Sequence, residues 1–314
     1  MRSTPSHDAQ GEIMTDTTTD QAASDKPSVI SDLLGNLLDD AANVVEAPTA
    51  YTGLHGLPTG FRDLDAVTGG LTPGTLTVIA SRPQMGRTTL LSDICRNTAI
   101  KHNIATAVYS LEESGEFFLM RVLAAEARVA RHHILSGVMD DAAWTRLARR
   151  VPVVSAAPLH VKTPGRLTMA TLEAEARELV EEHGVALLAV DGIQDIRPAK
   201  RSDLREREVG DVVRDLKTLA RELNIPVVAT SHLNRNPEQR YNRLPMLDDL
   251  RESGAITFAA DTILLLHRED AYEKDTPRAG EADFYVAKHR QGPTCVITTA
   301  FQGHYGRFVD MMQT

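Results

Sequence analysis

The chain has 314 residues, 42% of them hydrophobic and 25% charged, and a formal net charge of −9. This composition is that of a globular protein with one large domain or two small ones, and the length allows a substantial buried core. No apolar run approaches the roughly 20 residues of a transmembrane helix, and the first residues lack the apolar core of a signal peptide. Cys95 and Cys295 are isolated thiols without metal-ligand spacing, so we expect a reduced, cytoplasmic protein with no membrane partner.

The acidic charge is concentrated near the N-terminus. Residues 1–50 hold nine acidic and two basic side chains, which leaves a net charge of only −2 for residues 51–314. The acidity therefore does not argue against a nucleic-acid partner for the larger part of the chain. Residues 1–28 are rich in Ser, Thr, Asp and Gln and have little to bury, so we predict a disordered acidic tail.

An apolar stripe at helical spacing follows this tail and predicts a linker helix within residues 29–50. Its members are Ile30, Leu33, Leu34, Leu37, Leu38, Ala41, Val44 and Val45. Two interpretations stay open. The helix packs on its own domain, or it docks on a neighbouring subunit, because a linker containing Pro48 and Gly53 separates it from the rest of the chain.

In the remaining domain, 51–314, strand and helix patterns alternate. Short apolar runs predict strands at 76–80, 106–111, 159–162, 185–190, 225–230, 262–266, 283–288 and 295–300. Longer amphipathic runs predict helices at 88–102, 116–129, 142–150, 169–183, 205–223 and 248–260. This alternation is typical of an α/β fold with a mostly parallel central sheet and helices on both faces. The last two strands predict an antiparallel extension at the C-terminus.

The segment 75–90 is predicted to form a strand, a tight loop and the start of a helix. It nearly fits the P-loop pattern G-x-x-x-x-G-K-[ST], in which loop N–H groups cradle phosphates and the lysine reaches the outer phosphates. Two positions depart from the pattern, because Ser81 stands at the first glycine and Arg87 at the lysine. The predicted nucleotide-binding residues are Ser81, Arg82, Pro83, Gln84, Met85, Gly86, Arg87, Thr88 and Thr89.

Two acidic residues follow other predicted strands. Asp191 ends an apolar run in the Walker B form, whose carboxylate supports Mg²⁺ together with the hydroxyl of Thr88. Glu112 is suited to orient or deprotonate an attacking water. Taken singly, an apolar strand followed by Asp is common, and Glu112 has the alternative of an exposed acid at a strand end. Because parallel strands end at one edge of the sheet, the combination predicts a site for ATP and Mg²⁺ there.

Longer stretches carry a more specific pattern, namely 59–65, 82–86, 110–112, 191–194, 231–235, 249–254 and 288–293. On these stretches the chain resembles the C-terminal, RecA-like motor domain of the DnaB family of replicative DNA helicases. The resemblance covers residues 52 to 310, nearly everything after the tail and the linker helix. The family tolerates a small residue other than glycine at the position of Ser81.

The resemblance implies a homo-hexameric ring that binds ATP between subunits. Arg87, Thr88, Glu112 and Asp191 of one subunit would face Lys288 and Arg290 of the next, with Arg290 as an arginine finger that stabilises transition-state charge. Gln194 and His232 would complete the nucleotide contacts. His232 stands where the family usually has a glutamine that senses phosphate.

The resemblance also implies that single-stranded DNA passes through the ring. The channel loops match 197–206 and 234–254, and the implied DNA-binding residues are Arg235, Arg240, Arg251, Glu252 and Gly254. From the residues alone, these arginines more commonly belong to a solvated charged loop. Tyr241 by itself does not make a platform for stacking bases.

We therefore expect an ATP-dependent DNA helicase or translocase that couples ATP hydrolysis to unwinding in DNA replication. Replicative family members carry a separate N-terminal domain that binds primase. Here a tail and one helix stand in its place, which favours an accessory paralogue that works with other replication proteins.

The alternative is a nucleotide-binding paralogue that hydrolyses ATP weakly or not at all and regulates another helicase. It is motivated by Arg87, which replaces a compact ammonium with a longer planar fork. A RecA-like ATPase of the recombination-accessory or clock-protein type is disfavoured by the stretches 249–254 and 288–293.

Overall fold

The structure is a computed structural model and describes residues 55–198, 202, 204–250 and 253–311. All of them belong to the second of the two units into which the chain divides, Thr49–Thr314. The predicted tail, the predicted linker helix and the residues Arg251 and Glu252 lie outside the described residues. Within the described ranges, no helix is both long enough and apolar enough to cross a membrane.

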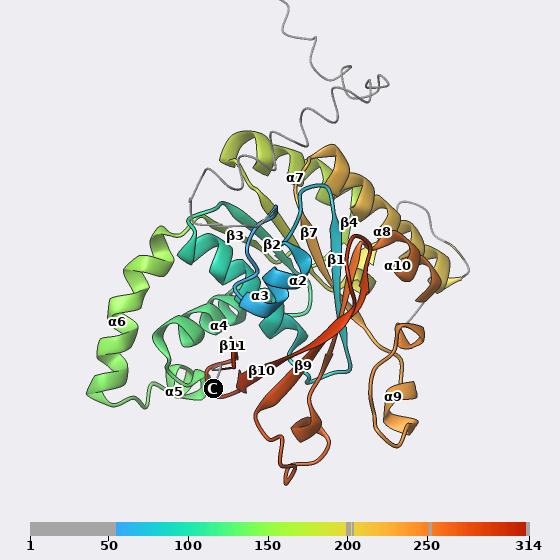
Figure 1. Cartoon of the computed structure of the whole chain (residues 1–314). Helices are drawn as coiled ribbons and strands as arrows, with labels where there is room; N and C mark the ends of the chain where they lie inside the picture. The colour runs from blue at the N-terminus through green and yellow to red at the C-terminus, as the bar shows by residue number, and fades with distance from the viewer. Residues whose placement is uncertain (1–54, 199–201, 203, 251–252, 312–314) are drawn as a thin grey trace, which may run out of the picture. The chain divides into compact units, whose positions relative to one another are not determined.

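A nine-stranded sheet forms the centre of this unit (Figure 1). Six neighbouring strands run parallel in the order β8-β1-β7-β5-β2-β3. Their bounds are β1 (Leu76–Ser81), β2 (Thr106–Ser110), β3 (Leu159–Lys162), β5 (Leu187–Asp191), β7 (Val227–His232) and β8 (Thr262–His267). Every residue of β1, β2 and β5 is buried, as expected for central parallel strands covered on both faces. The predicted parallel sheet is confirmed.

Three antiparallel strands extend the sheet beyond β8. They are β9 (Glu281–His289), β10 (Cys295–Gln302) and β11 (Arg307–Asp310), and each pairs with the strand before it. This confirms the predicted C-terminal extension. A separate two-stranded sheet of β4 (Leu167–Thr168) and β6 (Ile196–Arg197) was not predicted, because two residues are too few to show an alternating pattern.

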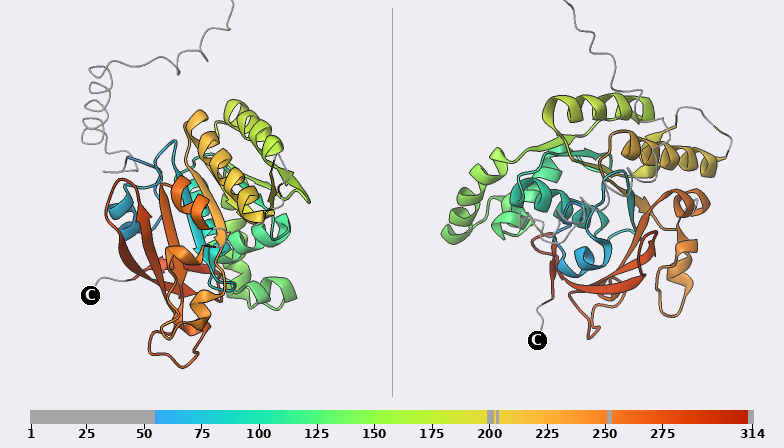
Figure 2. Two further views of the ribbon diagram at one scale, coloured as in Figure 1. Left: turned by 90° about the vertical axis from the view of Figure 1, so that its right-hand side faces the viewer. Right: turned by 45° about the horizontal axis from the view of Figure 1, so that its top comes forward.

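One face of the sheet is covered by α7 (Met169–His183), α8 (Arg205–Glu222) and α10 (Ser253–Ala259). Helices α7 and α8 contact each other and lie side by side in every view (Figures 1 and 2). Along α8 the buried residues recur at helical spacing, and they are Val209, Val212, Val213, Leu216, Leu219 and Ala220. The polar side of the helix faces outward, so this amphipathic pattern is what places α8 on the sheet.

The opposite face carries α2 (Arg62–Thr68), α3 (Arg87–Arg96) and α4 (Gly115–Ala127), which share a second apolar core with the sheet. Helix α6 (Asp141–Ala156) packs against α4, and α5 (Arg131–Ser136) lies between them in sequence. Side chains cap three of the helices: Ser114, Asp140 and Thr168 accept the backbone N–H three residues later. Such caps satisfy N–H groups that have no partner within the helix.

Three predicted helices differ from those observed. The predicted helix 142–150 continues through Pro152 to the end of α6 at Ala156. The predicted helix 88–102 is α3 followed by a π-helical turn, Asn97–Lys101. The predicted helix 248–260 is shorter, because a 3-10 turn at Leu247–Asp249 comes first and Leu250 then pairs with Leu233 in an isolated bridge. The buried carboxylate of Asp249 also accepts the N–H of Met246 at 2.7 Å. The short helix α9 (Asn236–Gln239) and the 3-10 turns Ile193–Asp195 and Glu269–Ala271 complete the described elements.

Asp93 is buried in α3 and ties this helix to the last strand. It accepts hydrogen bonds from Arg96 at 2.8 Å and from the N–H of Phe308 at 2.7 Å. Burial raises its pKa from 3.8 to about 6, and Arg96 opposes that rise. The pKa of Asp93 is higher in the folded chain than in the unfolded chain, so the folded chain binds the proton more tightly. Protonation of Asp93 therefore stabilises the fold fully below the unfolded pKa of 3.8, and this stabilisation is lost as the pH rises through the folded pKa of about 6.

We expect Asp93→Asn to remove this pH dependence. Relative to the variant, the wild-type chain should lose about 3 kcal/mol of unfolding free energy between about pH 4 and pH 7. Urea unfolding of both proteins at a series of pH values measures the difference. Asparagine has one amide oxygen, which keeps the acceptor for the N–H of Phe308 and loses the acceptor for Arg96. That loss is the same at every pH, so the pH-dependent part of the difference reports the ionisation. Parallel stability curves for the two proteins would contradict the assignment.

Candidate functional site

Polar side chains from four neighbouring strands meet at the carboxyl edge of the parallel sheet. Strands β1, β7, β5 and β2 are adjacent in that order, and their register pairs Ser81 with His232 and Ser110 with Asp191. A cleft of about 360 Å³ opens at this edge, lined by Ser81, Arg82, Pro83, Gln84, Gly86, Arg87, Thr88, Thr89, Glu112, Arg121, Arg131, His232, Phe301, Gly303 and Gly306. The structure therefore brings the P-loop, Glu112 and His232 together.

The loop after β1 has the backbone that a phosphate cradle needs. Gln84 and Gly86 have φ values of 66° and 104°, in the left-handed region. A Cβ atom on Gly86 would lie 2.7 Å from Cζ of Phe308, so only glycine fits here without a shift. Helix α3 begins at Arg87 without a side-chain cap from any described residue, which leaves its first N–H groups available to an anion. Met85 points into the core instead, at 2% exposure.

Arg87 is buried at the base of the cleft and joins two functional groups. Its Nη1 donates to the carbonyl oxygen of Ser231 at 3.2 Å and lies 3.0 Å from Nδ1 of His232. Its Nη2 forms an ion pair with Glu112. Nε2 of His232 lies 3.2 Å from the same Glu112 oxygen. Nε2 of His232 also lies 3.2 Å from Nη2 of Arg87, so the imidazole contacts both terminal nitrogens of the guanidinium as well as Glu112.

This closed set of contacts, the Arg87–His232–Glu112 triangle, sets the charge of Glu112. The hydrogen bond from His232 lowers the pKa of Glu112, burial opposes this, and Arg87 lowers it further. The carboxylate therefore stays ionised at neutral pH and is able to accept a proton.

Asp191 is fully buried at the end of β5 and has an unfilled acceptor. Its Oδ1 accepts the hydroxyl proton of Thr230 at 2.7 Å, while Oδ2 is buried without a hydrogen-bond partner among the described residues. Burial raises its pKa, and the hydrogen bond from Thr230 opposes that rise. An unsatisfied buried carboxylate oxygen next to a threonine hydroxyl fits the oxygen-rich, sparse protein ligation of Mg²⁺.

Gln194 lies beneath the cleft and does not line it. Its Nε2 donates to the hydroxyl of Ser231 at 2.9 Å, and its buried Oε1 has no partner in the part of the chain that the structure describes. It thus contacts the residue whose carbonyl oxygen holds Arg87. Gln194 therefore contacts Arg87 only through Ser231, and it is not itself in the predicted phosphate site.

Three functional candidates at or beside the cleft were missed from the sequence. The ring of Phe301 lines the cleft, and the guanidinium of Arg268 lies 3.6 Å from its centroid. Arg268 also donates to the carbonyl oxygen of Gln84 in the P-loop at 3.3 Å. Arg121, held by Glu113 at 2.7 Å, adds positive charge to the cleft. No short motif marks these residues: Phe301 of β10 and Arg268, just after β8, come in from far along the chain, and Arg121 is one position within helix α4.

Lys288 and Arg290 lie at the other edge of the sheet. Lys288 is next to Ile263 near the start of β8, whereas Ser81 of the P-loop strand is next to Leu266 near its end. Lys288 donates to the carbonyl oxygens of Thr257 at 2.7 Å and Ala260 at 2.5 Å. Arg290, half-exposed, lies 3.3 Å from Asp261. Neither residue reaches the P-loop cleft of its own chain.

The family model described as the DnaB-like helicase C terminal domain matches residues 56–310, more than half of the chain. The chain belongs to this family.

Curated relatives are replicative helicases that are longer than this chain. DnaB of Leifsonia xyli subsp. xyli is 46% identical over 272 residues, which cover 86% of this chain and 60% of that protein. DnaB of Mycobacterium leprae is 48% identical over 223 residues, 71% of this chain and 37% of that protein. The DnaB-like chain thus spans between 37% and 60% of the length of these relatives.

Solved structures share the fold. An ATPase domain of known structure matches with a TM-score of 0.84 at 28% identity, covering 91% of this chain and all of that one. A DnaB-like replicative helicase, solved in a study of its interactions with primase, matches with a TM-score of 0.81 at 28% identity, covering 92% of this chain and 68% of that one. The DnaB-like chain therefore has the RecA-like fold that its sequence predicts.

The residues that the resemblance implies to bind DNA differ in their exposure and in their partners in this DnaB-like chain. Arg235 is exposed at the start of α9. Arg240 is engaged instead by both carboxylate oxygens of buried Asp249 and by the carbonyl oxygen of Leu244. Gly254, in α10, is exposed with open space around it. These placements leave the DNA-binding role of the set a prediction and give Arg240 a structural role.

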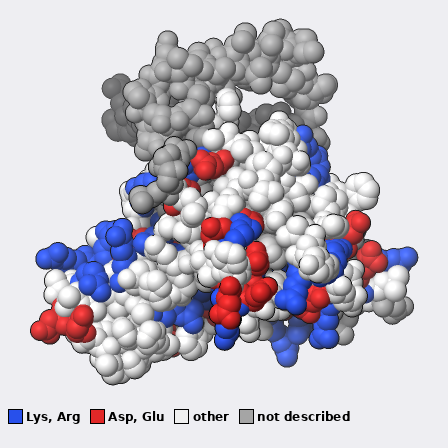
Figure 3. Space-filling view, turned by 60° about the horizontal axis from the view of Figure 1, so that its bottom comes forward, with Lys and Arg blue, Asp and Glu red and all other residues white. Residues whose placement is uncertain are grey.

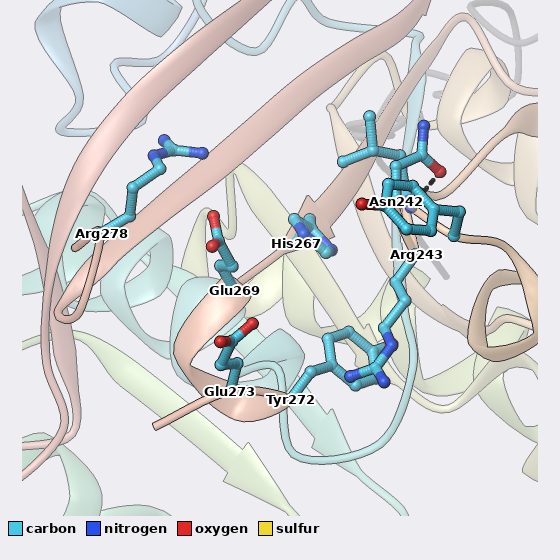
Figure 4. A pocket seen from close by; sticks show the side chains of 9 residues that line it. Asn242, Arg243, His267, Glu269, Tyr272, Glu273 and Arg278 are labelled. Carbon is cyan, nitrogen blue, oxygen red and sulfur yellow. Dashed lines mark hydrogen bonds between the residues drawn. The ribbon is translucent and has the colours of Figure 1, made fainter. Parts of the chain in front are cut away.

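A larger cavity, about 510 Å³, lies between the loop after α9 and the turn after β8 (Figure 4). Arg243 stacks over Tyr272 on one wall, and the carboxylates of Glu269 and Glu273 lie near each other on another. Arg278 is occupied by Asp283 and Glu281. This cavity mixes acidic and basic groups, and no phosphate-binding loop is present among its lining residues. Although it is larger than the P-loop cleft, it is therefore not the candidate nucleotide site.

Proposed function

We propose that this DnaB-like chain is an ATP-hydrolysing motor that acts as a ring on single-stranded DNA and couples hydrolysis to unwinding. The observation that carries the proposal is the Arg87–His232–Glu112 triangle inside the P-loop cleft. In this triangle the carboxylate of Glu112, which is able to act on water, contacts Arg87 and His232, which are able to contact phosphate.

The cleft supplies separate contacts for each part of ATP. The loop amides and the uncapped start of α3 receive the phosphates. Thr88 and Asp191 would hold Mg²⁺, which neutralises phosphate charge when bound. Phe301 lines the cleft beside the P-loop, where its ring packs against Arg268 and Phe308, so it would meet the base with its edge.

Glu112 would orient the attacking water and accept its proton. Its pKa is lowered by His232 and Arg87, so the ionised form is present before substrate binds. A bound phosphate would compete with Glu112 for the guanidinium of Arg87, since both are anions that a planar fork binds well. ATP binding would then release Glu112 to act on water, and His232 would remain to position it.

We expect Glu112→Gln to lower DNA-stimulated ATP hydrolysis by roughly 100-fold, the usual effect of losing a general base. Nucleotide affinity should not fall and should rise somewhat, because a neutral glutamine competes less with phosphate for Arg87 than the carboxylate does. Phosphate release with and without single-stranded DNA measures the rate, and fluorescent-nucleotide titration measures the affinity. An unchanged hydrolysis rate would remove the proposed role of Glu112.

The proposed ring follows from the separation of the two edges of the sheet. The P-loop and Lys288 lie at opposite ends of six-residue strands, roughly 15 Å or more apart. If Lys288 and Arg290 contact nucleotide, they must therefore contact that of another subunit. In a head-to-tail ring each subunit presents one edge to each neighbour, which brings Arg290 toward the next P-loop.

A mixing experiment tests this arrangement. We expect Arg290→Ala and Glu112→Gln chains to be nearly inactive alone and to recover about one quarter of wild-type ATPase activity when mixed equally, because a quarter of random interfaces then combine an intact Glu112 with an intact Arg290. Mass measurement confirms that the mixture forms mixed rings. Recovery no greater than the average of the separate proteins would show that Arg290 does not act between subunits.

The DNA would contact the loops that resemblance assigns to the channel, 197–206 and 234–254, and phosphate contacts there would make binding salt-dependent. Exposed Arg235 is the best placed of the described arginines to contribute. Other replication proteins are proposed partners, as in the solved relative studied with primase.

A second candidate function is motivated by the buried position of Arg87. In it the ion pair between Arg87 and Glu112 is permanent, and the chain binds nucleotide and regulates another helicase without turnover. The two functions differ in what lysine at this position would do.

We expect Arg87→Lys to lower the hydrolysis rate at least about tenfold, because one ammonium cannot contact Ser231, His232 and phosphate with the geometry of a guanidinium. Steady-state ATPase assays with single-stranded DNA provide the measurement, and nucleotide affinity serves as the control for an intact cleft. A large gain in turnover would instead favour the regulatory function.

A further inference from the structure

A second concentration of positive charge lies away from the P-loop. A cavity of about 430 Å³ opens between the end of α3, the end of α4, α6 and β11. Its charged lining residues are Arg96, Lys101, Arg128, Arg150, Arg307 and the single acid Glu126. Lys and Arg gather on the side of the molecule where α6 lies (Figure 3).

The carboxylates near this basic pocket do not balance its cations. Glu126 is shared by Arg96 at 2.5 Å and Arg150 at 3.0 Å. Asp93 adds a second contact to Arg96. Lys101 and Arg128 are exposed and form no ion pair with any described residue.

Arg307 also lacks a negatively charged partner in the described part of the chain. It donates to the neutral oxygens of Gln302 at 2.8 Å and Ala125 at 3.3 Å. Burial and the nearby charges of Arg128 and Arg96 lower its pKa, the effect of like charges held together. Within the described ranges, Nε of Arg96 is buried without a partner. The carbonyl ends of α4 and of the turn Asn97–Lys101 offset only part of this charge.

We propose that the basic pocket binds a small polyphosphate anion, at a site distinct from the P-loop. Five cations converge from separate elements on one bounded cavity, which suits a compact ligand with several negative charges. A nucleic-acid backbone would instead favour cations spread along a groove. The two sites lie at opposite ends of one helical run, Arg87 to Lys101, roughly 20 Å apart.

The basic pocket shares residues with the support of the P-loop. Arg96 binds Asp93, which holds the N–H of Phe308, and the ring of Phe308 packs where a side chain on Gly86 would lie. Arg307 is the residue before Phe308. An anion that draws Arg96 or Arg307 toward itself therefore acts on the contacts that position the P-loop.

Calorimetric titration of the full chain with inorganic pyrophosphate tests the proposal, and only the part of the binding that the pocket variants weaken is assigned to the basic pocket. We expect the double variant Lys101→Glu/Arg128→Glu to bind pyrophosphate at least about tenfold more weakly, because both charges face the pocket and neither supports the fold through an ion pair with a described residue. The matched control Arg146→Glu/Arg149→Glu makes the same charge change on exposed positions of α6 outside the pocket. It should change affinity by no more than about twofold.

Three results would overturn the proposal. Equal weakening in both double variants would reduce the effect to overall charge, and no weakening in either would place pyrophosphate at a different site. Displacement of pyrophosphate by a short thymidine oligonucleotide would indicate a nucleic-acid surface. If the glutamate variant fails to fold by circular dichroism, Lys101→Gln/Arg128→Gln provides the same test with neutral side chains. The assignment holds whether or not the P-loop hydrolyses ATP.

Discussion

The parallel register of β1, β7, β5 and β2 is the constraint on which the site depends. Because these strands are paired in register, Ser81 stands beside His232 and Ser110 beside Asp191. Glu112, two residues beyond the end of β2, then reaches the same edge. A shift of one residue in any of these pairings would turn the polar residue at its end toward the opposite face. The buried apolar runs that precede these residues therefore position the chemistry as well as forming the core.

The antiparallel extension supports the P-loop from a distance in sequence. Phe308 fills the space that a side chain on Gly86 would occupy, and Phe301 stacks on Phe308 with ring centroids 4.9 Å apart. Arg268 bridges Phe301 and the carbonyl oxygen of Gln84. The loop that cradles phosphate is thus held by side chains from β10, β11 and the end of β8. This explains why the sheet continues past the six strands that carry the predicted phosphate and metal groups.

Most of the fold could be predicted because the core strands and long helices have clear periodicity. The stretches ending at Ser81, Glu112, Asp191 and His232 were predicted to meet, and they do. What could not be predicted are contacts between distant segments: Arg268 on Phe301 has no local signal. Likewise, the sequence alone cannot reveal that Asp249 recruits Arg240, which resemblance assigned to DNA. Helix α10 is shorter than its pattern because a bridge between Leu233 and Leu250 competes with helical hydrogen bonds.

Arg87 is the position where the sequence motif and the tertiary structure lead to the most different interpretations. In the P-loop pattern it replaces the lysine, which suggests a loss of function. In the structure its Nη1 donates to the carbonyl oxygen of Ser231 and its Nη2 forms the ion pair with Glu112, while His232 lies within 3.2 Å of both nitrogens. A lysine ammonium could neutralise Glu112 but could not hold these partners in one plane.

His232, where the resemblance implies a glutamine, lies against the guanidinium of Arg87. Its Nδ1 is 3.0 Å from Nη1 and its Nε2 is 3.2 Å from both Nη2 and the carboxylate of Glu112. Two departures that look like separate losses in the sequence thus form one contact in the fold. That pairing is the structural reason to regard the cleft as adapted to arginine.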